Sequence, residues 1–410
     1  MNYLIQAPAG RKLCASLRLP ASKSISNRVL ILNALSDSPY DIRNLSDSDD
    51  TRVMQGVLNS NGCDFNIGAA GTAMRFLTAF LSKIAGEWTL TGTERMKNRP
   101  VRLLVDALNT LGARIEYMEK EGFPPLRIFG SALQGGEISL SGGVSSQYVS
   151  ALLMLAPLME KGLILHLEGG IVSAPYIRLT MQLMEQFGAV TGWEGQTLRV
   201  LPGRYTPVPF TVESDWSAAS YWYAMAALSS EAEISLKGLS GKSLQGDAAG
   251  AGLFARLGVE TDFTGEGLVL RRTGDCCKQM TYNFVNEPDL AQTFVVACAG
   301  LGIPFRFTGL QSLRIKETDR IEALKTELRK LGYLLAGSQD SVLEWTGERC
   351  EPEGQPVIRT YDDHRMAMAF TPLALSHPQG ITIANPEVVS KSYPAFWEDM
   401  QTAGFGLIVN

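Results

Sequence analysis

Six glycines constrain the fold of this 410-residue chain more than any other feature. Each follows a helix-like apolar pattern and precedes an extended segment, and they are Gly62, Gly112, Gly188, Gly258, Gly332 and Gly404. Glycine readily adopts the left-handed backbone conformation that ends a helix and turns the chain into a strand. The first interval is 50 residues and the later ones are 70 to 76. We therefore expect an α/β fold built from one supersecondary unit of roughly 70 residues, present six times.

The domain organisation follows from the strands and prolines between these glycines. Alternating segments at 138–140, 163–167 and 198–200 predict strands. Three prolines within residues 202–209 indicate a crossing between domains, with a new helix from about Ser217, and a strand at 13–19 that ends at Pro20 suggests a second crossing. We expect a first lobe of residues 21–213 and a second lobe of residues 1–20 plus 214–410, with ligand bound between the lobes.

Composition excludes several classes of function. The net charge is −5 and the basic residues are dispersed, which argues against a nucleic-acid partner. No apolar run reaches the roughly 20 residues that span a bilayer, and the N-terminus has no secretory apolar region, so we expect a cytoplasmic protein. Six cysteines without a C-x-x-C pair and only three histidines argue against a zinc site or a disulfide framework.

The segment RIKETDR, residues 314–320, combines two cations with a carboxylate. If it opens a helix, Lys316 and Arg320 lie four residues apart on one face of its first turn, where backbone N–H groups and the helix dipole favour an anion. Glu317 between them adds a proton-transfer group. A solvated first helical turn is the alternative interpretation of the same residues.

Similar polar segments recur along the first lobe. The loop SKSISNR, residues 22–28, precedes an apolar helix at 29–35, so that Ser22 or Ser24 caps the helix while Lys23 and Arg28 supply charge. Further segments of this kind, each also explained by helix capping or a solvated loop alone, are GAAGTAMRF at 68–76, ERMKNRP at 94–100, VSSQYVSALL at 144–153 and SAPY at 173–176.

The second lobe adds candidate acid–base groups. Asp289 stands at a helix start after Pro288, where it serves either as a dipole partner or as a general base. TYDDHRMAMAF, residues 360–370, places Asp363, His364 and Arg365 before an apolar helix, and Lys391 lies in a loop before a short helix. No GxSxG motif accompanies the histidine, which argues against a nucleophilic triad.

Together these motifs resemble a known enzyme family over nearly the whole chain. In order, LPASKSISNR, GAAGTAMR, NRP, SSQY, SAPY, PDLAQT, RIKETDR, DDHRMAM and SKSYP are similar to the 5-enolpyruvylshikimate-3-phosphate synthases. The resemblance implies a two-lobed inside-out α/β barrel with three βαβαββ units in each lobe. It also implies transfer of the enolpyruvyl group of phosphoenolpyruvate to the 5-hydroxyl of shikimate 3-phosphate, with release of phosphate, in chorismate and aromatic amino-acid biosynthesis. No metal or organic cofactor is implied, and we expect a monomer that acts on small molecules and closes its lobes on binding.

The resemblance also assigns roles to the matching positions. The shikimate 3-phosphate site is implied to comprise Lys23, Ser24, Arg28, Ser145, Ser146, Gln147, Ser173, Tyr176, Asp289, Ser312 and Lys316. The phosphoenolpyruvate site is implied to comprise Lys23, Gly71, Arg99, Gln147, Arg320, Arg365 and Lys391. For catalysis, Asp289 is implied to handle the hydroxyl proton and Glu317 the methylene proton, while Lys23 and Lys316 supply charge.

Four positions depart from the family pattern, and two rival functions remain. The departures are Ala21, Ala69, Phe76 and Ser312, where Gly, Asn, Pro and Asn are common. One rival is the enolpyruvyl transferase that acts on UDP-N-acetylglucosamine, but the first loop, SKSISNR, lacks its lysine–asparagine pair, and the loop ERMKNRP lacks its reactive cysteine. The other is an inactive scaffold of the same fold, which has no need of the intact set of charged residues.

Overall fold

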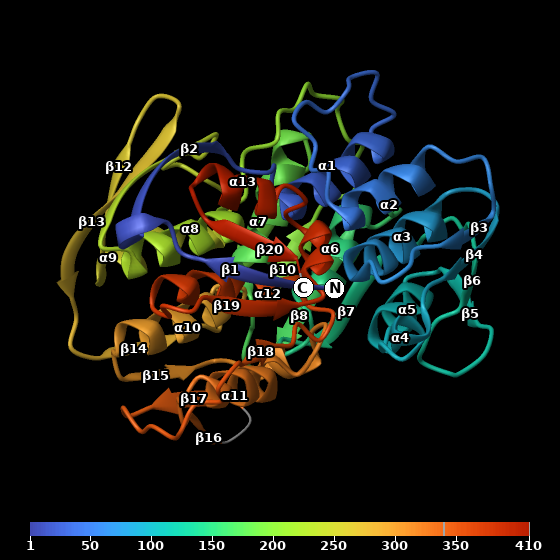
Figure 1. Ribbon diagram of the computed structural model, residues 1–410. Helices are drawn as coiled ribbons and strands as arrows, with labels where there is room; N and C mark the ends of the chain where they lie inside the picture. Colours follow the sequence, from blue (N-terminus) through green and yellow to red (C-terminus); the bar gives the residue numbers. More distant parts are fainter. Residues whose placement is uncertain (339–340, 410) are drawn as a thin grey trace. The chain divides into compact units, whose positions relative to one another are not determined.

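The computed structural model describes residues 1–338 and 341–409, which form two compact units. One unit is the continuous stretch Ser22–Val212 and is called here the insert unit. The other consists of Met1–Ala21 together with Glu213–Asn410 and is called the split unit. Figure 1 follows the chain in colour, with the dark-blue strands β1 and β2 among strands from the distant second half of the sequence.

One topology recurs in all five four-stranded sheets of the described chain. In each sheet the first two strands of the repeat are parallel, as a helical crossover requires, and the last two complete the sheet in antiparallel pairs. The order in space is therefore first, second, fourth, third. The predicted βαβαββ unit is this arrangement.

The insert unit holds two of these sheets. Its strands are β3 (Asp64–Asn66), β4 (Glu87–Thr91), β5 (Arg114–Tyr117), β6 (Leu126–Phe129), β7 (Gly136–Ser141), β8 (Leu163–Glu168), β9 (Thr191–Glu194) and β10 (Thr197–Val200). Its helices are α1 (Lys23–Leu35), α2 (Asp49–Leu58), α3 (Gly71–Lys83), α4 (Glu94–Lys97), α5 (Arg102–Thr110), α6 (Ser146–Leu155) and α7 (Ala174–Gln186), with a 3-10 turn at Ala156–Leu158. The predicted strands at 138–140, 163–167 and 198–200 lie inside β7, β8 and β10.

The third repeat of the insert unit keeps its helices without a four-stranded sheet. Helices α1 and α2 pack together, and between residues 36–48 and 203–212 the described backbone forms a single parallel bridge, Arg43 with Thr211. Pro207 and Pro209 lie in this second segment, and proline cannot donate a backbone hydrogen bond to a sheet. In the described residues this repeat thus differs from the other five, each of which forms a four-stranded sheet.

The split unit holds the other three sheets. Its strands are β1 (Asn2–Gln6), β2 (Lys12–Arg18), β11 (Glu231–Lys237), β12 (Leu257–Phe263), β13 (Gly267–Cys276), β14 (Met280–Asn283), β15 (Phe305–Thr308), β16 (Ala336–Ser338), β17 (Val342–Trp345), β18 (Val357–Ile358), β19 (Ile381–Ala384) and β20 (Gly406–Val409). Strand β2 pairs in parallel with β11, and β1 lies between β19 and β20. Both sheets are thus completed by the N-terminal segment.

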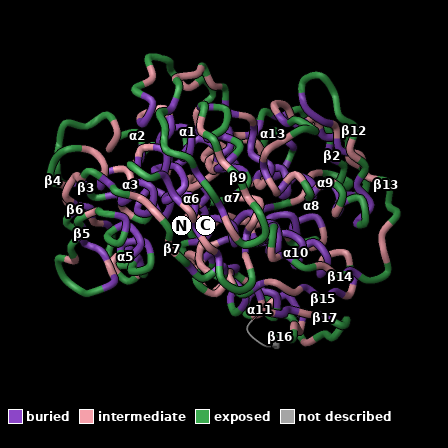
Figure 2. The backbone as a smooth tube through the Cα atoms, turned by 180° about the vertical axis from the view of Figure 1, so that it is seen from behind, coloured by how far each residue is buried: buried purple, intermediate pink, exposed green. Residues whose placement is uncertain are grey.

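Helices of the split unit connect these strands. They are α8 (Trp216–Leu228), α9 (Gly250–Ala255), α10 (Ala291–Leu301), α11 (Arg320–Lys330), α12 (His364–Phe370) and α13 (Phe396–Thr402). The 3-10 turns are η1 (Ala9–Arg11), η3 (Gly246–Ala249), η4 (Gln311–Ile315), η5 (Thr371–Leu375) and η6 (Pro386–Lys391). Helix α8 is buried at every residue except Ser217, and Figure 2 shows α8 and α10 largely in the colour of buried residues. Helices that are apolar on all sides, as these two are, belong in a core.

Five of the six predicted glycine turns are confirmed. Gly112, Gly188, Gly258, Gly332 and Gly404 all have a φ between 76° and 102°. At Gly404 the turn after helix α13 is closed by Phe405 N, which donates to Met400 O at 3.0 Å, a bond that typifies a left-handed helix cap. Gly62 is the exception, because α2 already ends at Leu58 and the φ of Gly62 is not left-handed.

Candidate active site

Four helices of the insert unit, α1, α3, α6 and α7, contact one another around Arg28. Its Nε donates to Thr180 Oγ1 of α7 at 2.7 Å and its Nη2 to Ser150 Oγ of α6 at 3.1 Å, while Phe76 of α3 lies 5.4 Å from its Cζ. Each of these residues lies one to two turns inside its helix. The carbonyls of Ser24 and Tyr176, in the first turns of α1 and α7, also accept from Arg28, so the starts of these two helices lie beside its guanidinium, where helix N–H groups and dipoles favour an anion.

Arg28 itself is buried and is 3% exposed. Its donors are occupied by Thr180, Ser150 and the carbonyls of Ser24 and Tyr176. Burial without a carboxylate partner among the described residues lowers the pKa of Arg28 to about 10. The structure thus places Arg28 between the helices, and its role as a ligand of shikimate 3-phosphate stays a prediction.

Gly71, Arg75 and Arg99 are brought together at the N-terminus of α3. A Cβ on Gly71 would lie 2.6 Å from Arg99 Nη1, so a larger residue would displace this guanidinium from its place beside α3. Arg75 Nη1 donates to the Gly71 carbonyl at 2.9 Å. Gln147 joins this group from α6, because its Nε2 donates to Thr72 Oγ1 at 3.0 Å. Three residues implied for phosphoenolpyruvate, Gly71, Arg99 and Gln147, are therefore neighbours.

The SKSISNR segment is helical, where a loop was expected. Helix α1 begins at Lys23, six residues before the predicted start, because Ser22 caps it by accepting from Ile25 N at 3.4 Å. Lys23 thus stands in the first turn of α1, and its Nζ lies 3.9 Å from Asp50 Oδ2 near the start of α2. Apolar periodicity marked the helix interior and missed this polar first turn.

The hydroxyl residues of the insert unit also stand at helix starts. Ser145 caps α6 by accepting from Gln147 N at 3.3 Å, with Ser146 buried beside it. Ser173 precedes α7 with a left-handed φ of 55° and makes no capping bond through its side chain. Its backbone therefore has the kind of constrained conformation that often marks a functional site.

In the split unit, Asp289 is the meeting point of three cations. Its Oδ2 lies 2.9 Å from Arg365 Nη2, and its Oδ1 lies 3.4 Å from Arg320 Nη1 and 3.6 Å from Lys316 Nζ. These residues come from four separate segments, since Asp289 precedes α10, Lys316 follows η4, Arg320 opens α11 and Arg365 lies in α12. Of the predicted residues in the split unit, the structure brings these four together most closely.

Arg320 is the most deeply buried cation of this cluster, at 1% exposure. Its Nε lies 2.7 Å from Asp363 Oδ2 and its Nη2 lies 2.8 Å from Glu317 Oε2. Burial alone lowers the pKa of Arg320, but the carboxylates of Asp363, Glu317 and Asp289 outweigh it and raise the pKa above its ordinary value. With its amide oriented to satisfy both neighbours, Gln292 accepts from Arg320 Nη1 and donates to the Asp289 carbonyl, each at 3.1 Å.

The expected helical geometry of RIKETDR is wrong. Helix α11 begins only at Arg320, because the Asp319 carboxylate caps it by accepting from Ile321 N and Glu322 N. Lys316 lies before the helix in extended backbone, so it does not share a helical face with Arg320. The two cations nevertheless converge, because both face Asp289.

Lys391 and Ser312 are the remaining predicted residues of the split unit, and of the two only Lys391 has a side-chain hydrogen bond to the neighbourhood of the cluster in the described chain. Lys391 ends η6, and its Nζ donates to the carbonyl of Asp362, next to the cluster residue Asp363, at 2.7 Å. Ser312 lies in η4 with its hydroxyl shielded from solvent and without a hydrogen bond to the described part of the chain. Contact of Ser312 with substrate stays a prediction.

Three residues of the cluster were given no role in substrate binding or catalysis from the sequence. Asp363 is fully buried, caps α12 through Arg365 N and pairs with Arg320. Ser217 and Tyr221 of α8 accept from the guanidinium of Arg365 at 3.4 and 3.3 Å. The local sequence is compatible with Asp363 as a helix cap. It gives no indication that Asp363 pairs with Arg320, which lies 43 positions away.

A fourth residue without an assigned role, Asp247, adds a carboxyl group that is linked to Arg365 through Ser217. The hydroxyl of Ser217 donates to Asp247 Oδ2, while Oδ1 is buried without a hydrogen-bond partner in the described chain. Burial and the nearby charge of Asp289 raise the pKa of Asp247 to about 7, although Arg365 and Ser217 act in the opposite direction. This carboxyl group therefore changes charge near neutral pH.

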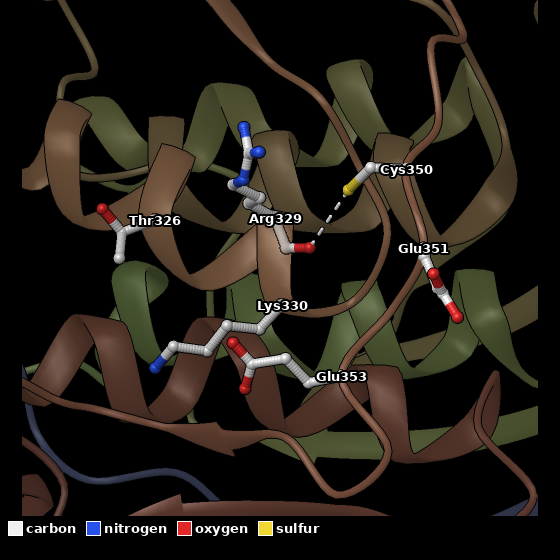
Figure 3. A pocket seen from close by; sticks show the side chains of 6 residues that line it. All are labelled: Thr326, Arg329, Lys330, Cys350, Glu351 and Glu353. Carbon is white, nitrogen blue, oxygen red and sulfur yellow. Dashed lines mark hydrogen bonds between the residues drawn. The ribbon is translucent and has the colours of Figure 1, made fainter.

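A hollow of about 440 Å³ at the far end of α11 is separate from these residues. Figure 3 shows its lining, with the thiol of Cys350 directed to the Arg329 carbonyl at 3.4 Å. None of the residues assigned to substrates lines it. The functional site is therefore assigned from the convergence of charged groups, which the chemistry of anionic substrates requires.

The split-unit cluster pairs each cation with a carboxylate. Lys316, Arg320 and Arg365 are matched by Asp289, Glu317 and Asp363, which keeps these buried and half-buried charges compensated. Such an arrangement can exchange one carboxylate for a substrate anion. It can also move a proton, because Asp289 and Glu317 are 16% and 25% exposed at the side chain and so are accessible.

Comparisons with known proteins confirm the resemblance. The family model described as EPSP synthase (3-phosphoshikimate 1-carboxyvinyltransferase) matches residues 8–64 and 55–400. A 3-phosphoshikimate 1-carboxyvinyltransferase of Bacteroides fragilis is 59% identical over 410 residues, covering 100% of this chain and 99% of the relative. One of Photobacterium profundum is 37% identical over 413 residues, covering 94% of this chain and 95% of the relative.

The fold class is confirmed by a solved structure. An EPSP synthase from Acinetobacter baumannii matches with a TM-score of 0.80 at 20% identity, covering all of both chains. Among the helices that the structure describes, none is long and apolar enough to cross a membrane. With a family model that spans most of its length and relatives that span all of it, the chain belongs to the EPSP synthase family and is a transferase.

Proposed function

We propose that this chain transfers the enolpyruvyl group of phosphoenolpyruvate to the 5-hydroxyl of shikimate 3-phosphate. The hydroxyl oxygen bonds to carbon 2 of the donor while carbon 3, the methylene carbon, gains a proton. The C–O bond to phosphate then breaks as a proton leaves carbon 3, so that 5-enolpyruvylshikimate 3-phosphate and phosphate are formed. The single observation that carries the proposal is the convergence of Lys316, Arg320 and Arg365 on the one carboxylate of Asp289. A donor with both a phosphate and a carboxylate needs several cations at once.

Asp289 is proposed as the base for the 5-hydroxyl. Its carboxylate faces Lys316, Arg320 and Arg365, the cations proposed to hold the charges of the substrates, so it stands where the reacting hydroxyl is expected. Its 16% exposed side chain leaves room for a hydroxyl group to approach. Lys316 next to it balances the negative charge of the substrates.

Glu317 is proposed as the donor of the proton to the methylene carbon. In the described structure its carboxylate is held by Arg320 Nη2 at 2.8 Å, and the donors of Arg320 already face four neighbours. We infer that an anionic group of phosphoenolpyruvate replaces Glu317 at this guanidinium. Once moved away from this guanidinium, the carboxylate of Glu317 takes up a proton from solvent and passes it to the methylene carbon.

The insert unit is proposed to hold shikimate 3-phosphate. Lys23, Ser24, Ser145, Ser146 and Ser173 stand at the starts of α1, α6 and α7, and side chains of this kind suit a phosphate and a ring of hydroxyls. Arg99, Gly71 and Gln147 are proposed to contribute to the phosphoenolpyruvate site with Lys23, Arg320, Arg365 and Lys391. We further propose a cytoplasmic monomer, and closure of the two lobes on binding stays a prediction.

The proposal is tested by supplying phosphoenolpyruvate with different acceptors and measuring phosphate. We expect release only when shikimate 3-phosphate is present. Release with UDP-N-acetylglucosamine instead would assign the chain to the other enolpyruvyl transfer reaction. No release with either acceptor would favour an inactive scaffold and contradict the proposal.

A further inference from the structure

The segment 357–363 is fastened along the side of helix α11. At the C-terminal end of the helix, Lys330 Nζ donates to the Val357 carbonyl at 2.9 Å. At the N-terminal end, Arg320 holds Asp363. Between them, Glu327 lies two turns beyond Arg320 on the same buried face, about 10 Å along the helix axis.

Glu327 is a fully buried carboxylate with three partners. Its Oε1 accepts from the Tyr361 hydroxyl at 2.6 Å, and its Oε2 accepts from Arg359 N at 3.0 Å and faces Lys330 Nζ at 2.6 Å. Charge-assisted bonds of this length are among the strongest in proteins. The middle of the segment is therefore bound to α11 chiefly through Glu327.

The residues that follow this attachment have an uncommon backbone. Tyr361 and Asp362 both have a φ of 54°, in the left-handed region that side chains other than glycine rarely occupy. Two such residues in succession persist only where the surrounding structure fixes them. The bond from Tyr361 to Glu327, at 2.6 Å, is a contact that helps to fix the first of them.

The turn at residues 361–363 is linked to three cations of the proposed phosphoenolpyruvate site, Lys391, Arg320 and Arg365. The carbonyl of Asp362 accepts from Lys391 Nζ at 2.7 Å. The next residue, Asp363, pairs with Arg320 and caps the helix that carries Arg365. A change in the turn therefore moves the partners of all three cations together.

We propose that Glu327, acting through the Tyr361 hydroxyl, is a positioning residue for the donor site formed by Lys391, Arg320 and Arg365. Its hydrogen bonds and ion pair run to Tyr361, Arg359 and Lys330, and it acts on the three cations through the backbone of the turn. The inference rests on the proposed function, since it concerns the binding of phosphoenolpyruvate. Its effect is expected on this substrate and not on shikimate 3-phosphate, whose proposed groups lie mainly in the insert unit.

The test compares Tyr361→Phe with Tyr205→Phe. The first removes the hydroxyl bonded to Glu327 and keeps the ring, whereas the second removes a buried hydroxyl bond of similar length, from Tyr205 to the Met154 carbonyl at 2.7 Å, in the other unit. We expect Tyr361→Phe to raise the KM for phosphoenolpyruvate by about tenfold, with the KM for shikimate 3-phosphate within about twofold of wild type. Tyr205→Phe is expected to lower Tm without raising the KM for phosphoenolpyruvate relative to the KM for shikimate 3-phosphate.

Two kinetic results would overturn the inference. One is a KM for phosphoenolpyruvate in Tyr361→Phe that stays within about twofold of wild type while Tm falls, which means a structural role only. The other is an equal rise of both KM values. Phosphate release by the wild-type protein is measured first, because its absence would contradict the proposed function and not the role of Glu327.

A crystal structure of Tyr361→Phe decides the inference independently of activity. We expect residues 361–362 to leave the left-handed region and the bond from Lys391 to the Asp362 carbonyl to be lost. Retention of both features would overturn the positioning role, whatever the wild-type activity is.

Discussion

Single residues of the split-unit cluster depend on one another because their charges are buried together. Arg320 is matched by Asp363, Glu317 and Asp289, and removing one member of such a set leaves a charge uncompensated. Conservative substitutions that keep shape are therefore more informative here than truncations to alanine.

Glu317→Gln separates proton transfer from binding. The amide oxygen can still accept from Arg320, so we expect stability and the affinity for an unreactive phosphoenolpyruvate analogue to change little, while kcat falls by about 10²- to 10⁴-fold. Calorimetry in buffers of different ionisation enthalpy is expected to detect proton uptake when wild type binds the analogue, and none in Glu317→Gln.

The matched control for this prediction is Glu322→Gln. Glu322 is a half-exposed carboxylate on the helix that follows, α11, and pairs with Lys325 at 3.2 Å. It is expected to keep wild-type kcat and proton uptake. A wild-type kcat in Glu317→Gln would remove Glu317 from the mechanism.

Asp247→Asn tests the buried carboxyl group behind Arg365. Because the folded-state pKa of about 7 lies above the ordinary value of 3.8, the folded protein holds a proton that the unfolded chain has lost between these pH values. Its contribution to stability is thus fully present below about pH 4 and is lost as pH rises through about 7. We expect Asp247→Asn to gain stability relative to wild type across this window, on the order of 1 to 3 kcal/mol.

Urea unfolding at a series of pH values measures this difference. Burial, Asp289 and Asp215 raise the pKa of Asp247, whereas Arg365 and Ser217 lower it. The slope of the free energy of unfolding against pH therefore depends on all of these groups. Asp275→Asn, at an exposed position of the same unit, is the control and is expected to show no such slope difference. Parallel stability curves for wild type and Asp247→Asn would contradict the assignment.

At the scale of elements, the glycine pattern predicted the repeat because local sequence governs how a helix ends. It failed at Gly62, since α2 stops at Leu58, and nothing near Gly62 in the sequence distinguishes it from the five left-handed glycines. Helix starts were harder to predict. Polar first turns such as residues 23–28 carry no apolar periodicity, and the Asp319 cap shifted the start of α11 to Arg320.

Gly404→Ala and Gly62→Ala test the element-scale account as a pair. Gly404 has a φ of 90° and room for a Cβ, whose nearest neighbour is Pro8 Cβ at 3.4 Å, so the cost is mainly that of a left-handed alanine. We expect Gly404→Ala to lose about 1 to 2 kcal/mol in the free energy of unfolding. Gly62→Ala is expected to lose nothing, and equal losses in the two variants would refute the distinction.

The candidate site was predictable in its residues and only partly in its geometry. Asp289, Lys316, Arg320 and Arg365 were all identified from their segments, and they do meet. The pairings of Arg320 with Asp363 and of Glu327 with Tyr361 join positions 43 and 34 apart. Such contacts depend on how the repeats pack, which local patterns do not specify.

At the scale of the whole molecule, the chain order explains how two units arise from one repeat. The insert unit enters between β2 and α8, and β2 still completes the sheet of β11. Likewise, β1 supplies the fourth strand of the sheet whose other strands are β18, β19 and β20. The N-terminal segment Met1–Ala21 is therefore part of the split unit.

The most direct test of the central claim is the identity of the product. The chain is incubated with phosphoenolpyruvate and shikimate 3-phosphate, and the acceptor is analysed by mass spectrometry while phosphate is counted. We predict an acceptor that gains one enolpyruvyl group for each phosphate released. Phosphate release without a modified acceptor, or no reaction of wild-type protein at all, would contradict the claim.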